Sequence, residues 1–420
     1  MDNETITARQ MGHTYMINSA TFAKRYKDTL SDFGTWEQRE HASEWILLPQ
    51  NVVKEQGIDE TSLQGELYTI VHNKEAHGRK GAIVAVVKGT NPADVLRVLM
   101  RLPADKREMV ESITMDLSDC MRAIAREAFP NAIVIRDCFH VVKRGGDGCE
   151  EIRLRLKREA VKELNRQKAE FRKYLEGLAA QRKAYRERMK AKHGKRWKKS
   201  KRGKKPKRLN TRFEPPRLTN GETLVEALTR CRKQLSMSRE KWSLTQEKRA
   251  KILFELYPKL EEAYNLINSL RAVFRNKKLT KETAEKKLEE WYGKVAACTL
   301  REIKSVRDTI KFYEDEILNY FIERQTNASA ESLNSKIKCF RAQVKGVRDI
   351  PFFMYRLATV FRLASVLPPS HRVCRLRRVF LYLQEKSEGK MEVFEKNVVF
   401  SGIAASFVGD FHSFSLSLQA

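Results

Sequence analysis

The feature that most constrains the fold is a series of short apolar runs between Gly57 and Lys143, bounded by turn-forming residues or by helical stretches. Runs of this length that are rich in β-branched residues are typical of buried strands. The order is three strands, a helix, a strand, a helix and a strand, at GIDETSL, ELYTIVHN, GAIVAVVKG, NPADVLRVLMRL, ESITMDL, SDCMRAIAREAF and AIVIRD. The sequence therefore predicts an α/β fold with the order β-β-β-α-β-α-β.

Strand signals stop at about residue 149. Up to residue 325, segments such as KRAKILFELYPKLEEAYNLINSL carry apolar residues at helical spacing, which predicts a large all-helical insertion domain. Within it, residues 182–208 hold sixteen Lys or Arg against one acid and are expected to form an exposed basic loop or helix end. The predicted domains are an N-terminal helical segment with helices at SATFAKRYKDTLSDF and EHASEWILL, the first part of the α/β core, the helical insertion, the C-terminal helices of the core and a tail: 1–55, 56–148, 149–325, 326–368 and 369–420.

The charge of the chain indicates the class of its partner. Its 420 residues include 82 Lys and Arg against 53 Asp and Glu, which gives a formal net charge of +29. Such an excess predicts a polyanionic partner, most commonly nucleic acid, and we expect double-stranded DNA. No stretch approaches the roughly 18 apolar residues of a membrane span, and the start MDNETITARQ lacks the apolar region of a signal peptide. We therefore expect a cytoplasmic protein with no membrane association.

Three acidic residues stand out by position: Asp59 in the first predicted strand, Asp116 at the end of the fourth, and Glu331 on a helix far downstream. Singly, each would be an ordinary solvated acid or helix cap. In the RNase-H-like arrangement of a mixed sheet with this order, however, the first and fourth strands lie side by side, so two of the carboxylates would meet. Three clustered carboxylates need a compensating cation and suit one or two Mg²⁺ or Mn²⁺ ions. Two such ions, roughly 4 Å apart, can clamp the attacking and leaving oxygens of a phosphoryl transfer.

Two motifs resemble a known family. The run TMDLSDCMRAIAREAFPNAIVIRDCFHVVK, followed by TNASAESLNSKIKCFRAQVKGVRD, is similar to the DDE transposases of bacterial insertion sequences, closest to their ISL-three family, over residues 57–143 and 327–361. The resemblance implies that Asp59, Asp116 and Glu331 are catalytic metal ligands. It also implies that the helical stretch is the insertion domain of mutator-like and hAT-like relatives. The implied activity is metal-dependent cleavage at transposon ends and strand transfer of the 3′-OH into target DNA by a DNA-bound homo-oligomer.

Asp137 and His140 form a D-x-x-H pair that is similar to the C/D-x-x-H element of those relatives. The resemblance implies that both residues support the metal ligands from beside the active site. Two alternatives stay open. His140 can be an ordinary, partly buried core histidine, and Asp137 can replace Asp116 as the second catalytic aspartate because it also ends a strand.

Basic residues in two places are candidate DNA contacts. Asn334 and Lys338 share a helix face with Glu331, and Arg341 flanks that face, which suggests contact with the DNA backbone; a solvated helix face is the alternative. In the segment 182–208, Lys and Arg can bind phosphates and a Trp can stack on a base, whereas a solvated loop is again the alternative. The contacts predicted there are Arg196, Trp197, Lys198, Lys199, Lys201 and Arg202.

One departure from the family concerns the start of the chain. Relatives usually carry a cysteine-rich zinc ribbon and a helix-turn-helix ahead of the core, but only 58 residues precede Asp59 and none of them is Cys. We therefore expect a separate DNA-reading protein as a partner, unless the reading frame is truncated. Two other classes of function are alternatives: a non-catalytic DNA-binding or regulatory remnant, which the intact acids disfavour, and an RNA-binding protein or nuclease, which no RNP-type motif supports.

Overall fold

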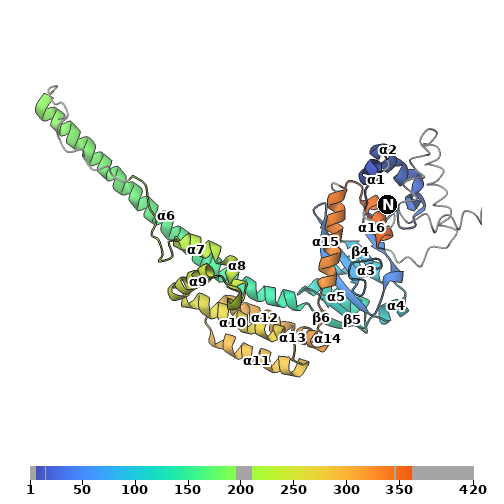
Figure 1. Cartoon of the computed structure of the whole chain (residues 1–420). Helices are drawn as coiled ribbons and strands as arrows, with labels where there is room; N and C mark the ends of the chain where they lie inside the picture. The colour runs from blue at the N-terminus through green and yellow to red at the C-terminus, as the bar shows by residue number, and fades with distance from the viewer. Residues whose placement is uncertain (1–5, 15, 195–210, 345–346, 362–420) are drawn as a thin grey trace, which may run out of the picture. The chain divides into compact units, whose positions relative to one another are not determined.

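The structure, a computed structural model, describes residues 6–14, 16–194, 211–344 and 347–361. The chain, drawn in Figure 1, divides into two compact units. The first unit comprises residues 1–111, 123–132 and 327–420, and the second comprises residues 112–122 and 133–326.

Six strands form a mixed sheet in the order β1-β4-β3-β2-β5-β6. Their bounds are Trp45–Leu47 (β1), Glu55–Leu63 (β2), Glu66–Asn73 (β3), Ile83–Lys88 (β4), Ser112–Met115 (β5) and Ile133–Arg136 (β6). In the first unit β1, β4, β3 and β2 are antiparallel neighbours, and in the second unit β5 and β6 are parallel. The predicted α/β fold is confirmed, because β2 to β6 are the five predicted strands in RNase-H-like order and β1 adds one strand at the edge.

The helices of the first unit are α1 (Ala8–Thr14), α2 (Ser19–Arg25), α3 (Pro92–Leu99), α4 (Ala104–Glu108), α15 (Ala328–Gln343) and α16 (Ile350–Val360), and α5 (Asp119–Ala128) has residues in both units. In α15, Leu333, Ile337 and Phe340 recur at helical spacing and pack with Ile70 and Val86 of the sheet in one buried cluster. This packing leaves the opposite face of α15, which carries the charged residues of the motif, toward solvent.

The helix predicted at EHASEWILL is wrong. Residues 45–47 form the edge strand β1, in which Ile46 is fully buried opposite Val86 of β4. The run WILL is a short, continuous apolar stretch, so all of it can be buried in a strand, whereas a surface helix buries only one face. The helix predicted at SATFAKRYKDTLSDF is also shorter than expected, because α2 ends at Arg25 and gives way to a π turn and a 3₁₀ turn.

The second unit is mostly helical. After β6 come α6 (Cys138–His193), α7 (Leu224–Arg230), α8 (Arg232–Leu235), α9 (Leu244–Leu256), α10 (Pro258–Arg275), α11 (Lys281–Ala297), α12 (Arg301–Phe312), α13 (Glu314–Leu318) and α14 (Tyr320–Glu323). Its core gathers Leu260, Ile267, Trp291 and Ile303, all with at most 2% exposure. Among the described helices, none has both the length and the apolar character needed to cross a membrane.

Helix α6 starts earlier than the sequence suggested. It passes through the GGDG run, and two of these positions require glycine because a side chain there would crowd neighbouring helices. A Cβ on Gly148 would lie 2.8 Å from Val306 Cγ2, and one on Gly145 would lie 3.3 Å from Ile267 Cδ1. Of the two expected forms, loop or helix end, residues 182–193 are the helix end, since they form the last turns of α6. The contacts predicted between Arg196 and Arg202 lie outside the described residues.

Candidate metal centre

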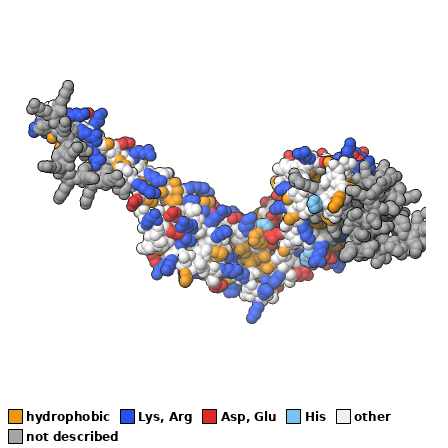
Figure 2. All heavy atoms as spheres, turned by 45° about the horizontal axis from the view of Figure 1, so that its top comes forward, with side chains coloured by type: hydrophobic (Ala, Val, Ile, Leu, Met, Phe, Trp, Pro, Cys, Tyr) orange, Lys and Arg blue, Asp and Glu red, His pale blue; other side chains and the backbone are white. Residues whose placement is uncertain are grey.

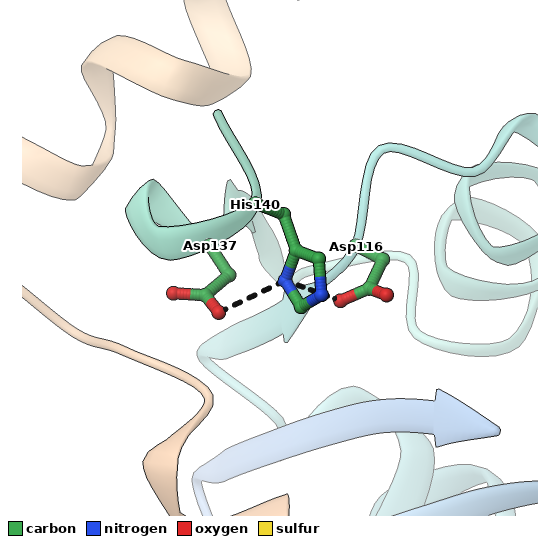
Figure 3. A group of neighbouring side chains, drawn as sticks. All are labelled: Asp116, Asp137 and His140. Carbon is green, nitrogen blue, oxygen red and sulfur yellow. Dashed lines mark hydrogen bonds and ion pairs between the residues drawn. The ribbon is translucent and has the colours of Figure 1, made fainter. Parts of the chain in front are cut away.

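Three of the predicted site residues meet at the ends of β5 and β6. The two strands are parallel, with Met115 opposite Arg136, so Asp116 and Asp137 follow them at the same edge. Asp137 is also the N-cap of α6, since its Oδ1 accepts a hydrogen bond from the Phe139 backbone nitrogen at 3.3 Å. The first turn of α6 then brings His140 between the two carboxylates (Figure 3).

The imidazole of His140 contacts both acids through one nitrogen. Nδ1 lies 2.9 Å from Asp116 Oδ1 and 3.1 Å from Asp137 Oδ2. A single N–H cannot point at both oxygens, and the contact with Asp137 is the one with hydrogen-bond geometry. The carboxylates, Asp116 first and then Asp137, raise the pKa of His140 to about 10 although burial opposes them. The imidazole is therefore positively charged at neutral pH when no other cation is bound.

The cluster fits a divalent cation. Asp116, Asp137 and His140 each offer a ligand atom, and these atoms all lie within 4.8 Å of one another. Asp116 Oδ1 is buried and makes no hydrogen bond. The imidazolium compensates its charge, and the oxygen keeps lone pairs that can bind a cation. Carboxylate oxygens are the ligands that Mg²⁺ and Mn²⁺ prefer, and imidazole also suits a transition metal. Within the part of the chain that is described, this candidate metal-binding cluster contains Asp116 and neither Asp59 nor Glu331.

Asp59 lies in β2 of the first unit and is held by α15. Its Oδ2 accepts a hydrogen bond from Asn334 Nδ2 at 2.7 Å, and its Oδ1 accepts one from the Glu60 backbone nitrogen at 2.8 Å. Asn334 also donates to the Glu60 carbonyl at 3.3 Å. The amide of Asn334 therefore fixes one oxygen of Asp59, a role that the sequence did not reveal, and its contact with DNA stays a prediction.

The α15 helix is tied to β2 at three points spaced seven residues apart. Asn327 donates to the Ile58 carbonyl at 3.4 Å, Asn334 contacts Asp59, and Arg341 donates to the Ser62 carbonyl at 2.8 Å. Two helical turns match each interval, so the three side chains emerge on the same side of the helix. Glu331 lies in the first turn of this anchored helix with its side chain exposed, and Lys338 is exposed further along.

A buried polar cluster fixes the first turn of α15. His72 of β3 is 1% exposed, and its Nε2 lies 3.0 Å from Ser329 Oγ. Burial, and then the charge of Lys74, lower the pKa of His72 to about 3, so it stays neutral. Gly57 makes room for the ring, because a Cβ there would lie 2.2 Å from His72 Cε1 and 2.9 Å from Asn327 Oδ1.

The outer part of α6, residues 161–193, presents a basic surface within the second unit. It carries eleven Lys and Arg against four Glu, and most of its side chains are exposed. Figure 2 shows Lys and Arg side chains gathered along this part of the helix. The described half of the predicted basic segment, residues 182–193, therefore has the exposure that phosphate contacts require.

A sheet with carboxylates at the ends of neighbouring strands suits metal-dependent phosphoryl transfer. Comparison with protein families matches residues 57–357 to a family described as transposase, the ISL-three family of DDE transposases. The match spans more than half of the chain, which therefore belongs to this family. No curated protein and no solved structure matches the chain.

Proposed function

We propose that this chain is the catalytic transposase of a bacterial insertion sequence, which cleaves DNA at the ends of its element and joins the freed 3′-OH to target DNA. The cluster of Asp116, Asp137 and His140 carries the proposal, because it lies within the region matched to the family and fits a divalent cation. Asp59, Asp116 and Glu331 are the proposed catalytic metal ligands. Asp137 orients His140 beside Asp116 through its hydrogen bond.

The proposed reaction has two steps. In the first, the oxygen of a water bonds to phosphorus at the element end and the P–O3′ bond breaks. The water releases a proton and the leaving O3′ gains one. In the second, the oxygen of the new 3′-OH bonds to a phosphorus of the target and releases its proton, and the P–O3′ bond of that target strand breaks as its O3′ gains a proton. One or two bound Mg²⁺ or Mn²⁺ ions would supply neutralisation of the charge that develops on the attacking and leaving oxygens.

Hydrogen bonds of neighbouring residues fix Asp59 and the helix turn that carries Glu331, two of the proposed metal ligands. Asn334 holds Asp59 by one oxygen. Asn327 and His72 hold the first turn of α15, which carries Glu331. The RNase-H-like strand order supports joint action of Asp59 and Asp116. In the proposal the three acids act on the same phosphodiester.

Double-stranded DNA, both element end and target, is the proposed partner. The exposed basic part of α6, together with Lys338 of α15, would neutralise phosphates without reading bases. Sequence reading at the element ends would then come from a separate DNA-reading protein, and the transposase would act as a homo-oligomer on the DNA of the bacterial nucleoid, in the cytoplasm.

Strand cleavage of the element's own ends, in Mg²⁺ and in Mn²⁺, tests this function. The Asp116→Asn variant is expected to lose cleavage while it keeps DNA binding. Asp147→Asn is a matched control, because Asp147 is an exposed acid of α6 and the same charge is removed. Cleavage by Asp116→Asn at the wild-type rate, or a folded wild-type chain that binds DNA and never cuts it, would refute the proposal.

A further inference from the structure

Arg136, at the end of β6 and directly before Asp137 of the candidate metal site, is a fully buried charged residue. Its Nε lies 2.7 Å from Glu316 Oε2, and the other oxygen of Glu316 lies 2.6 Å from Arg122 Nε. One carboxylate thus compensates two guanidinium groups. Burial lowers the pKa of Arg136, and the charge of Glu316 opposes that effect. Because arginine keeps its charge in proteins, the buried guanidinium depends on this partner.

The Nη1 nitrogen of Arg136 binds the backbone around Asp116. This nitrogen donates to the Asp116 carbonyl and, at 3.1 Å, to the Ser118 carbonyl. These carbonyls belong to the turn that follows β5, so Arg136 fixes the backbone from which the Asp116 carboxylate projects. A planar guanidinium can bridge Glu316 and two carbonyls at once, whereas the ammonium of lysine is a single point on a flexible stem.

Two side chains that contact the Arg136 guanidinium, those of Glu316 and Tyr313, come from the helical insertion. Glu316 lies in α13, and the ring of Tyr313, between α12 and α13, lies 4.2 Å from the Arg136 guanidinium carbon. Tyr313 also donates a hydrogen bond to Asp119 Oδ1 at 2.7 Å, at the start of α5. The insertion therefore contacts the segment around Asp116 in two ways: Glu316 acts through Arg136, and Tyr313 binds Asp119 directly.

We propose that Arg136 is a positioning residue for the metal ligand Asp116, and that Glu316 of the helical insertion sets the metal affinity of the site by holding Arg136. The inference rests on the proposed function, since it takes Asp116 to be a metal ligand. Residues that orient metal ligands typically change metal affinity by about 10- to 100-fold when they are altered.

The test is a titration of the full chain with Mn²⁺. The concentration of free Mn²⁺, measured from its electron paramagnetic resonance signal, gives the affinity. Arg136→Lys keeps the charge but loses the bridge, and is expected to weaken Mn²⁺ binding about 10-fold or more. Glu316→Gln is expected to weaken it in the same direction. Arg249→Lys is the matched control, because Arg249 makes an equally close pair with Glu222 in the same unit, with both contacts at 2.7 Å.

The outcomes separate this inference from the proposed function. If Asp116→Asn abolishes Mn²⁺ binding while folded Arg136→Lys binds like the wild type, the positioning role is wrong and the metal site stands. Equal weakening by Arg136→Lys and Arg249→Lys also overturns the role, because a general loss of stability would explain both. If Asp116→Asn leaves Mn²⁺ binding intact, the proposed metal site itself is wrong. If Arg136→Lys does not fold, wild-type affinity in Glu316→Gln overturns the inference.

Discussion

Acidification is expected to loosen the first turn of α15 through His72. In the folded chain burial holds the pKa of this residue at about 3, against an ordinary value of 6.5. Between these two values the unfolded chain binds a proton that the folded chain does not, so the stability that His72 contributes is complete above pH 6.5 and is lost as the pH falls. At about 1.4 kcal/mol for each pH unit, acidification to pH 5 removes about 2 kcal/mol.

Hydrogen exchange of the β3 amides, corrected for the intrinsic effect of pH, measures this loss. We expect the free energy of opening in the wild type to fall by about 2 kcal/mol more between pH 7.5 and pH 5 than in His72→Gln, which cannot titrate. His13→Gln, a change at an exposed histidine of α1, serves as the control and should behave like the wild type. If His72→Gln loses as much stability on acidification as the wild type, His72 is not the group whose protonation destabilises the fold.

Three further perturbations follow from the contacts. Gly148→Ala should destabilise the second unit by about 1–3 kcal/mol in urea unfolding, because its Cβ meets Val306, whereas Gly177→Ala in the same helix meets nothing and should stabilise by about 0.5–1 kcal/mol; equal effects would contradict the packing. Asn334→Ala should slow cleavage more than it weakens DNA binding, because Asp59 loses its fixed oxygen; a loss confined to binding would contradict this. Replacing four basic residues of 182–193 with Gln should flatten the slope of log affinity for duplex DNA against log salt by up to about 3.6 units, at about 0.9 for each lost phosphate contact, and an unchanged slope would contradict the proposed role of this surface.

The strands of the core could be predicted because each is a short apolar run bounded by turn-forming residues, a pattern that is visible in the local sequence. The D-x-x-H pair was readable for a similar reason. Asp137 caps α6, and His140 follows one turn later, so local geometry brings them together. Asp116 joins them because β5 and β6 are paired in parallel.

The sequence did not reveal contacts between distant segments. Asp59 and Asn334 are 275 residues apart, and Arg136 and Glu316 are 180 apart, so no local pattern pairs them. A charged residue in the buried run IVIRD signals that a partner must exist, but not which one. The GGDG run similarly suggests a turn by propensity, whereas it lies within α6, where Gly148 packs closely against Val306.

Strand transfer of a pre-cleaved element end into target DNA, in Mn²⁺, tests most directly whether one set of three acids performs the reaction. We expect Asp59→Asn, Asp116→Asn and Glu331→Gln each to abolish transfer while DNA binding is kept, and Asp137→Asn to reduce it less. Transfer at the wild-type rate by Asp59→Asn or Glu331→Gln would contradict the shared site. An active Asp116→Asn beside an inactive Asp137→Asn would make Asp137 the second catalytic aspartate.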